Sequence, residues 1–464
     1  MADSVSSSIS LVPPAAGDVA AFGYKQELKR SLGLAELLAY GLVFITPIAP
    51  VSVFGIVFNA SHGMVPLVYV IGLVAMVFVA LSYMAMAEAF PVAGSVYSYA
   101  ARSLGPVVGF FAGWAILLDY ILIPTLCYVA SAIAIASVFP GVSKALCVVL
   151  MVVAATIVNY LGIDSTVRTS FALLAFQLVL LVMFGFLGLH ALAQHVAGAH
   201  VSLAPFYNPA ELTPALVFGA LSLAVLSFLG FDAVSTLSEE SRHGSRMIGR
   251  ATMLALCLSA VLFVAQTWLA SLFFLGRTSL PPGDPTNAAF YDIAGTIGGS
   301  AFKFLLAIPG SFLSLLAGAI TAQAATARLL FSMARDGELP RVLAHVDPTR
   351  KVPGRAVLLV AAVTMFTGVF LIDRFELLTS MVSFGALLGF LLLQVSVIAH
   401  FIWREKSRQW LRHLVAPIIG FAIIGYVLVN AEPNAKIAGA AWMVAGIAMF
   451  VILKRLRRPT SLPL

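Results

Sequence analysis

Long apolar runs, separated by short polar or Gly/Pro-marked turns, follow one another along most of the chain. A helix crosses a bilayer core with about 20 apolar residues. Twelve runs are candidates, and they lie near 33–58, 64–88, 104–137, 142–162, 168–192, 213–238, 249–275, 302–333, 356–373, 377–402, 412–430 and 435–453. The pattern predicts an all-α integral membrane protein with twelve transmembrane helices. Residues 1–30 are rich in Ser, Ala and Pro without an early apolar run, so we expect a disordered cytosolic tail there, not a signal peptide.

Composition agrees with this pattern. Hydrophobic residues make up 61% of the 464 positions and charged residues only 10%, whereas a soluble domain carries about 25% charged residues. Soluble enzymes and nucleic-acid binders are therefore disfavoured. The three cysteines, Cys127, Cys147 and Cys257, all lie in apolar runs and form no disulfide framework or metal-ligand spacing.

The positive charge follows the predicted topology. If the N-terminus is cytoplasmic, only five of the 27 basic residues lie outside, and the other 22 lie inside. Those outside are Lys144, Arg277, Lys303, Arg374 and Lys436. The positive-inside rule then predicts an inner-membrane protein with both termini in the cytoplasm, and the net charge of +7 needs no nucleic-acid partner.

Two spans carry helix breakers at membrane depth. Pro47 and Pro50 lie in the first span, beside Thr46, and each removes a backbone donor and disturbs the preceding turn. Lipid cannot satisfy the groups that are released, so a broken backbone must face a cavity or packed protein. A simple proline kink is the alternative interpretation.

The sixth span contains Gly230 and, two residues later, the acidic residue Asp232. A carboxylate in the middle of a bilayer costs about 2.5–3.5 kcal/mol on insertion scales, so it is expected beside water, a counter-charge or unwound N–H groups. Spans one and six are five apart. Interrupted helices at corresponding positions of two halves are typical of transporters built from inverted repeats.

Four segments carry a resemblance to a known family. They are SFLGFDAV at 227–234, FPVAGSVYSY at 90–99, GWAILLDY at 113–120 and ARLLFSMARDG at 327–337. In this order they resemble the amino acid–polyamine–organocation (APC) superfamily of permeases. Within the superfamily, these segments are most similar to those of the putrescine-importer branch. Three further segments also match that branch: Thr46-Pro47, FGIV at 54–57 and TLSEE at 236–240.

The resemblance implies a LeuT-like fold with two inverted five-helix repeats and discontinuous helices 1 and 6. The transport core would occupy residues 31–403, and residues 404–464 would hold helices 11 and 12 and a short cytosolic C-terminus. Such proteins import or exchange amino acids and amines, commonly with a proton, from a site between the two breaks. A monomer or a homodimer in the lipid bilayer is expected, with a small-molecule substrate and no nucleic acid.

Two positions depart from the family pattern. The putrescine importers, which this chain resembles, carry an acid in the outer half of helix 1. This chain has Ser52 at the matching position, which weakens the assignment of a diamine as the substrate. Gln177 stands where some amino-acid members carry a proton-transferring lysine on helix 5. An amide cannot titrate, which removes the lysine mechanism from this chain.

Only Asp119 and Asp232 among the 20 acids lie well inside predicted spans. We expect Asp232 first, and Asp119 second, to couple transport to protons or to gate the site; for both, a structural hydrogen bond is the alternative role. Asp119 is also a candidate to attract a substrate ammonium. No cofactor or metal is expected, and the proton is the expected coupling ion.

Two substrate chemistries stay open. A zwitterion would place its carboxylate on N–H groups from Thr46 to Ala49 and its amine on carbonyls near Phe228 and Leu229. A diamine would depend on acids and on aromatic faces such as those of Phe228, Phe231 and Trp114, which are otherwise ordinary packing residues. The substrate-binding candidates are Phe44, Ile45, Thr46, Ile48, Ala49, Ser52, Asp119, Phe228, Leu229, Gly230 and Phe231.

The inner end of span six is acidic. Glu239 and Glu240 are expected to pair with Arg242 and Arg246 as an inner latch, with a solvated helix end as the alternative. The leading functional hypothesis is therefore a proton symporter, and an exchanger without net proton coupling is the main alternative. A membrane-embedded enzyme would need a cluster of His, Ser or metal-spaced acids within the spans, and a channel would need unbroken pore helices; the sequence provides neither pattern.

Overall fold

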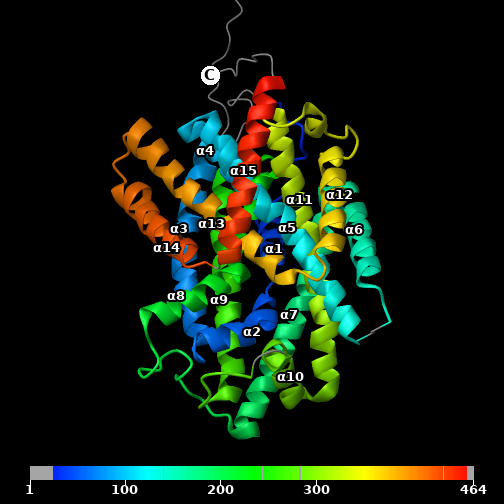
Figure 1. Cartoon of the computed structure of the whole chain (residues 1–464), viewed down its shortest axis with the longest axis vertical. Coiled ribbons are helices and arrows are strands. Elements are labelled where there is room, and N and C mark those ends of the chain that lie inside the picture. The colour runs from blue at the N-terminus through cyan, green and yellow to red at the C-terminus, as the bar shows by residue number, and fades with distance from the viewer. Residues whose placement is uncertain (1–24, 139–140, 243, 282–283, 432, 457–464) are drawn as a thin grey trace, which may run out of the picture.

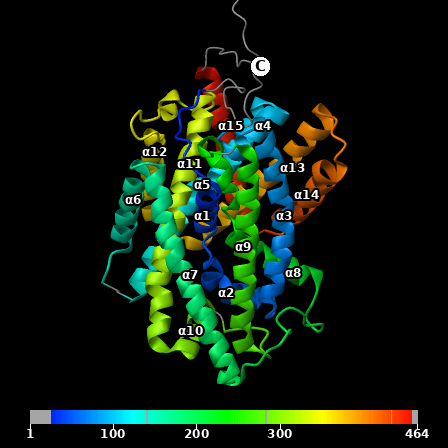
Figure 2. The same cartoon turned by 180° about the vertical axis from the view of Figure 1, so that it is seen from behind.

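The computed structural model describes residues 25–138, 141–242, 244–281, 284–431 and 433–456. Within these residues the chain is helical and contains no β-strand, only an isolated parallel bridge between Leu32 and Ser241. The helices run mostly along the long axis of an elongated bundle (Figures 1 and 2). In chain order the main helices are α1 (Leu34–Ile45), α2 (Ala49–Ala60), α3 (Val65–Ala89), α4 (Ser95–Leu104), α5 (Pro106–Val138), α6 (Lys144–Tyr160), α7 (Ile163–Ala193), α8 (Pro214–Ala224), α9 (Ser245–Ser271), α10 (Asp284–Leu305), α11 (Ser311–Arg335), α12 (Gly354–Phe370), α13 (Phe375–Val397), α14 (Ala416–Val429) and α15 (Pro433–Leu456).

Eight helices among the described residues are long and apolar enough to cross a membrane, and the bent pair α1 and α2 makes a ninth span. The apolar helices α6 and α12 are shorter, and the sixth predicted span is split into separate pieces, which is why a length criterion omits all three. Large apolar side chains such as Val182, Phe186 and Phe370 are mostly exposed on the outside of the bundle. This apolar surface is that of a multi-pass membrane protein.

The structure adds two helices that the apolar runs did not predict. Helix α10 begins at Asp284, before the predicted eighth span, and is joined to α11 through the π-helical turn Leu306–Gly310, which contains Pro309. Helix α4 is short and half polar, and it lies between the second and third spans. Neither matches a 20-residue apolar window, so the hydropathy pattern could not predict them.

The predicted break in the first span is confirmed. Helix α1 ends at Ile45, where Thr46 takes a left-handed backbone with φ of 61°, and α2 starts at Ala49. Pro47 cannot continue α1 because it lacks an N–H, whereas Pro50 is tolerated in the first turn of α2, where no intrahelical donor is needed. The two helix axes differ by 42°.

The predicted break in the sixth span is also confirmed. Helix α8 continues as the 3-10 helix η3 (Val225–Phe228), and the chain resumes as the 3-10 helix η4 (Phe231–Glu240). Gly230 lies between them with φ of 109°, a backbone conformation that glycine adopts without steric cost. A Cβ on Gly230 would lie 2.0 Å from Cδ1 of Phe44, so the two broken helices meet closely at this point.

Helix α15 is held against α5 by two tryptophans. The Nε1 group of Trp114 donates to the carbonyl of Trp442 at 2.9 Å, and Nε1 of Trp442 donates to the carbonyl of Trp114 at 2.7 Å. The two rings stack with centroids 4.7 Å apart. Trp114 is therefore a packing residue between α5 and α15, and the suggestion that its ring contacts substrate is wrong.

Candidate functional site

A cavity of about 110 Å³ lies where the two broken helices meet. It is bordered by the end of α1 and the start of α2, by the middle of α5, by η3 and its exit, and by α11. The lining residues are Phe44, Ile45, Thr46, Ala49, Ser52, Val53, Ile123, Leu126, Cys127, Leu226, Ser227, Leu229 and Leu315. Broken backbone at membrane depth thus faces a cavity, as the bilayer requires.

Part of the predicted substrate site lines this cavity and part does not. Six of the predicted residues are in the lining: Phe44, Ile45, Thr46, Ala49, Ser52 and Leu229. Five lie outside it: Ile48, Asp119, Phe228, Gly230 and Phe231. Gly230 still shapes the cavity, because the absence of a side chain there lets Phe44 approach the break.

The two phenylalanines of helix six turn away from the cavity. Phe228 packs against Tyr69 and Phe263, with ring centroids 5.9 and 5.3 Å away. Phe231 packs against Tyr83 and is fully buried. Phe44 is the aromatic ring that the structure places in the lining, so an aromatic contact with substrate would fall to it.

The lining residues from α5 and α11 were missed by sequence reasoning. Ile123, Leu126 and Cys127 follow Asp119 at helical spacing on α5, and Leu315 comes from α11. Their side chains are ordinary aliphatic or thiol groups, which look the same in sequence whether they face lipid, packed protein or a cavity. The one available signal was their position one to two turns beyond Asp119.

The polar groups of the lining are few and neutral. Ser52 donates to the carbonyl of Ala49 at 3.0 Å, and Ser227 shares a 3.0 Å hydrogen bond with Tyr69. No charged side chain lines the cavity among the described residues. Its polarity therefore comes from hydroxyl and backbone groups.

Backbone N–H groups at the first break already donate hydrogen bonds to carbonyls of the same chain. The Thr46 N–H donates to the carbonyls of Leu42 and Val43, and the Ala49 N–H donates to the carbonyl of Thr46 at 2.8 Å. The expected carboxylate contacts at these two N–H groups would thus require them to exchange partners. At the second break the N–H of Leu229 donates to Leu226 at 3.3 Å, and its carbonyl accepts no hydrogen bond from any described residue.

Asp232 lies at the centre of a buried hydrogen-bonded cluster. Its Oδ2 accepts hydrogen bonds from Tyr120 at 2.7 Å and from Tyr83 at 3.2 Å, while Oδ1 has no partner among the described residues. Ser95 donates to Tyr83 at 3.5 Å, and Ser235 donates to Ser95 at 3.0 Å. These hydrogen bonds join α3, α4, α5 and η4, so a change at the carboxyl group would reach four elements.

Asp119 is buried on α5, and neither of its carboxyl oxygens has a hydrogen-bond partner within the described part of the chain. Helix α13 approaches its backbone closely: a Cβ on Gly385 would lie 2.8 Å from the Asp119 nitrogen. Gln177 on α7 is likewise buried, with no partner for its amide in the described ranges. Unpaired buried polar groups are costly and often mark a functional site.

The inner latch involves different partners from those predicted. Glu239 pairs with Arg335, whose Nη2 donates to Oε1 at 2.7 Å, and it also accepts from the Ala93 N–H at 2.9 Å. Glu240 binds the Arg328 guanidinium through both oxygens. Both arginines lie on α11, so the predicted pairing with Arg242 and Arg246 is wrong. Those two side chains are exposed and follow the acids in sequence, whereas the true partners come from a distant helix.

The segment before α1 covers this same end of helix six. The N–H groups of Ser31 and Leu32 both donate to the carbonyl of Glu240, at 3.1 and 3.0 Å, and the Arg242 N–H donates to Leu32 at 2.9 Å. With the two ion pairs, these bonds close the end of the bundle where α4, α11 and the end of α15 lie (Figure 1). Helices α2, α8 and α10 lie at the opposite end.

Comparison with known proteins agrees with this architecture. A family model described as amino acid permease matches residues 35–453. The low-affinity putrescine importer PlaP of Escherichia coli K12 is 31% identical over 444 residues, which cover 93% of this chain and 96% of that protein. The branched-chain amino acid permease BcaP of Bacillus subtilis is 24% identical over 94% of this chain and 96% of its own length. The methylthioribose transporter of Bacillus subtilis is 22% identical over 93% of this chain and 94% of its own length.

Proposed function

The chain belongs to the amino acid permease family of the APC superfamily, and from that premise we propose that it is a secondary active transporter importing a small amino acid or amine across the inner membrane. Its named relatives are permeases and transporters, so it is a transport protein and not an enzyme. The observation that carries the proposal is the cavity at the meeting point of two broken helices, closed off toward one end of the bundle.

We propose twelve membrane spans for this transporter, with both termini in the cytoplasm. The eight long helices, the bent pair, α6, α12 and the split helix six together supply that number. The first and sixth of these spans are the broken ones, which supports two inverted five-helix repeats of the LeuT type. The latched end would then face the cytoplasm, and the cavity would be loaded from outside.

The expected cycle is alternating access. Substrate would enter the cavity while the Glu239 and Glu240 ion pairs keep the inner end closed, and release would require these pairs to separate from Arg335 and Arg328. These two buried ion pairs support a transporter and argue against an open channel. Exchange of one substrate for another, without net proton movement, is the alternative mode of the same cycle.

The cavity lining favours a neutral zwitterion with a small aliphatic side chain. A dication would enter a space bordered by Ile45, Val53, Ile123 and other apolar groups without a carboxylate in the described lining, and an uncompensated charge there is costly. A zwitterion can use the backbone groups of the two breaks. Its ammonium could bind the Leu229 carbonyl, which accepts no hydrogen bond within the described ranges. A small amine or diamine is the second candidate, which the 31% identity to a putrescine importer favours.

Placing an acid in the cavity should change this preference. In Ser52→Asp, putrescine is expected to compete with labelled substrate about tenfold better than in wild type, because a carboxylate in the lining attracts an ammonium group. Uptake into proteoliposomes with unlabelled amino acids, monoamines and diamines as competitors measures the shift. Ser52→Asn is the matched control, since asparagine has nearly the same volume as aspartate but carries no charge. If wild type already prefers diamines, the zwitterion assignment fails. If Asp and Asn behave alike, position 52 does not contact the bound substrate.

We further propose that Asp232 carries the coupling proton. Its fully buried carboxyl group is hydrogen-bonded to Tyr120 and Tyr83 directly after the break at Gly230, so protonation would change contacts across the moving elements. Wild-type uptake is expected to fall as external pH rises, by up to about tenfold per pH unit for one titrating group. Asp232→Asn should show a flat pH profile over the same range.

Asp119→Asn is the matched comparison for this measurement. It removes the other buried acid of the spans without touching the hydrogen bonds of Asp232. A pH profile that flattens only in Asp119→Asn would transfer the coupling role to Asp119. Wild-type pH dependence in both variants, together with counterflow that persists after a protonophore, would favour the exchanger.

A further inference from the structure

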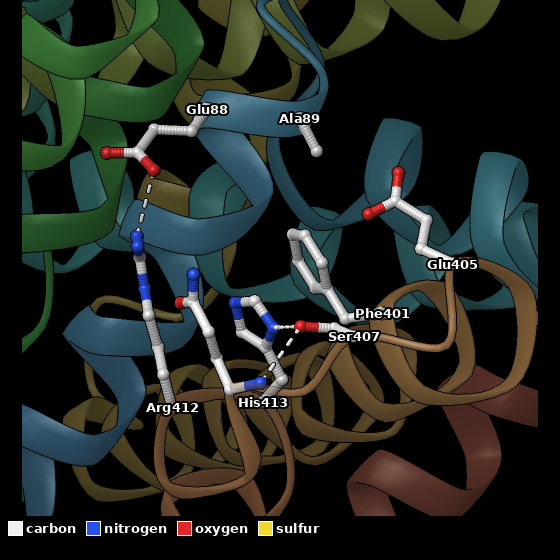
Figure 3. Close-up of a pocket in the computed structure, with 8 residues that line it drawn as sticks. Glu88, Ala89, Phe401, Glu405, Ser407, Arg412 and His413 are labelled. Atoms are coloured by element: carbon white, nitrogen blue, oxygen red, sulfur yellow. Dashed lines mark hydrogen bonds and ion pairs between the residues drawn. The ribbon is translucent and has the colours of Figure 1, made fainter.

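A second cavity, of about 360 Å³, lies away from the helix breaks, under the hairpin that joins α13 to α14. The hairpin comprises the π-helical turns Ile398–Arg404 and Leu411–Val415 and the loop between them. Figure 3 shows the side chains from the hairpin and from the end of α3 around this space. The lining residues are Glu88, Ala89, Phe401, Glu405, Ser407, Gln409, Arg412 and His413.

The cavity is lined by an ion pair and by a stacked imidazole ring. Arg412 reaches across to Glu88 with an Nη2 to Oε2 distance of 2.9 Å, while its buried Nε has no partner in the described chain. His413 is buried, its ring stacks on Phe401 with centroids 3.9 Å apart, and its Nδ1 lies 2.8 Å from the Ser407 hydroxyl. The stacked ring and the ion pair hold these side chains in fixed positions, and the Nε of Arg412 is shielded from solvent.

The rim of the hairpin has the composition of a membrane interface. Trp403 is 66% exposed, Trp410 is 62% exposed and Leu411 is 79% exposed. Between the two tryptophans lie the exposed basic residues Arg404, Lys406 and Arg408. Tryptophan rings prefer the headgroup level of a bilayer, and α13 and α14 lie at the outer edge of the bundle, where lipid would contact them (Figure 1).

From these features we propose that the hairpin binds the headgroup of an anionic phospholipid in the cytoplasmic leaflet. The inference rests on the proposed orientation, which places this end of the spans in the cytoplasm. Residues 403–412 carry four basic side chains and one acid, a net charge of +3, and a phosphodiester matches the exposed bases of the rim. Topology alone would require the basic residues but not the two exposed tryptophans that flank them.

Replacing Glu88 distinguishes lipid binding from a merely structural role of the cavity. Its carboxylate occupies the Arg412 guanidinium and repels an incoming phosphate. Glu88→Gln removes that competition, so it is expected to bind the lipid more tightly. Neutralising the rim bases is expected to do the opposite.

The test is native mass spectrometry of the full chain in detergent, titrated with phosphatidylglycerol, with phosphatidylcholine of the same acyl chains, and with glycerol phosphate. Phosphatidylglycerol is expected to bind at least about tenfold more tightly than phosphatidylcholine. The double variant Lys406→Gln, Arg408→Gln should weaken phosphatidylglycerol binding by about thirtyfold, or about fivefold per base. Glu88→Gln should tighten it by about fivefold.

The control is the double variant Arg341→Gln, Lys351→Gln, which removes the same charge from exposed positions of the loop between α11 and α12 on the same side of the protein. It is expected to bind phosphatidylglycerol like wild type. Equal binding of the two lipids, an equal loss in the control, or weaker binding in Glu88→Gln would overturn the proposal. Glycerol phosphate that binds as tightly as phosphatidylglycerol would also overturn it, because the site would then take a soluble anion. None of these readouts depends on transport, so they fail independently of the proposed function.

Discussion

Replacing Arg328 by glutamine is expected to lower the free energy of unfolding by about 3–5 kcal/mol, because the buried carboxylate of Glu240 loses its counter-charge. The guanidinium and the carboxylate are 5% and 1% exposed, and the guanidinium donates to both carboxyl oxygens. Glutamine can replace at most one of these donors and carries no charge. Chemical denaturation of the purified protein in detergent measures the loss.

A double-mutant cycle separates the pair from its surroundings. Glu240→Gln alone should cost a similar amount, whereas Arg328→Gln with Glu240→Gln should cost clearly less than the sum, since two neutral amides leave no buried charge unpaired. Lys303→Gln is the matched control, because its ion pair with Asp292 is about half exposed and is expected to contribute at most about 1 kcal/mol. Strictly additive losses in the cycle would show that the two side chains are not energetically coupled.

The pair also has a functional consequence. It fastens η4 to α11 at the end of the bundle that we propose faces the cytoplasm, together with Glu239 and Arg335. The double variant is therefore expected to populate the inward-open state more than wild type does. This links the stability measurement to the proposed cycle, since the same bond that stabilises the closed inner end must break during transport.

Substitution of Gly230 by alanine is expected to reduce uptake by more than about tenfold and to destabilise the protein by about 2–5 kcal/mol. Two effects combine at this position. The φ of 109° is unfavourable for any residue with a Cβ, and the added methyl group would lie 2.0 Å from Cδ1 of Phe44. Relief of that clash moves α1 against η4, at the edge of the cavity.

Two further variants resolve these effects. Gly337 also has a left-handed backbone, with φ of 78° after the end of α11, but a Cβ there would meet nothing within 4 Å, so Gly337→Ala measures the backbone strain without a clash. Phe44→Leu placed on Gly230→Ala frees space beside the new methyl group and should recover part of the lost stability. If Gly230→Ala costs no more than Gly337→Ala, the close approach of Phe44 has no energetic weight. Uptake and thermal unfolding are measured on the same preparations.

The breaks could be predicted from sequence because their causes are local. Pro47 ends α1 through its own backbone, whereas Pro50 is accommodated in the first turn of α2, and Gly230 is the residue type that a left-handed turn selects. The latch could not be predicted in the same way. The sequence placed Arg242 and Arg246 beside the acids, but the true partners, Arg328 and Arg335, are 88 and 96 residues away along the chain.

The sequence by itself determined an apolar multi-span helical protein, the position of its two breaks, its family and the two buried acids Asp119 and Asp232. These depend on composition and on local backbone chemistry. The tertiary structure decided which side chains meet. It turned Phe228 and Phe231 into packing residues, set Trp114 against α15, and brought aliphatic residues of α5 and α11 into the cavity. The direction of a side chain depends on the rotation and packing of whole helices, and an apolar residue has the same identity whether it faces lipid, protein or substrate.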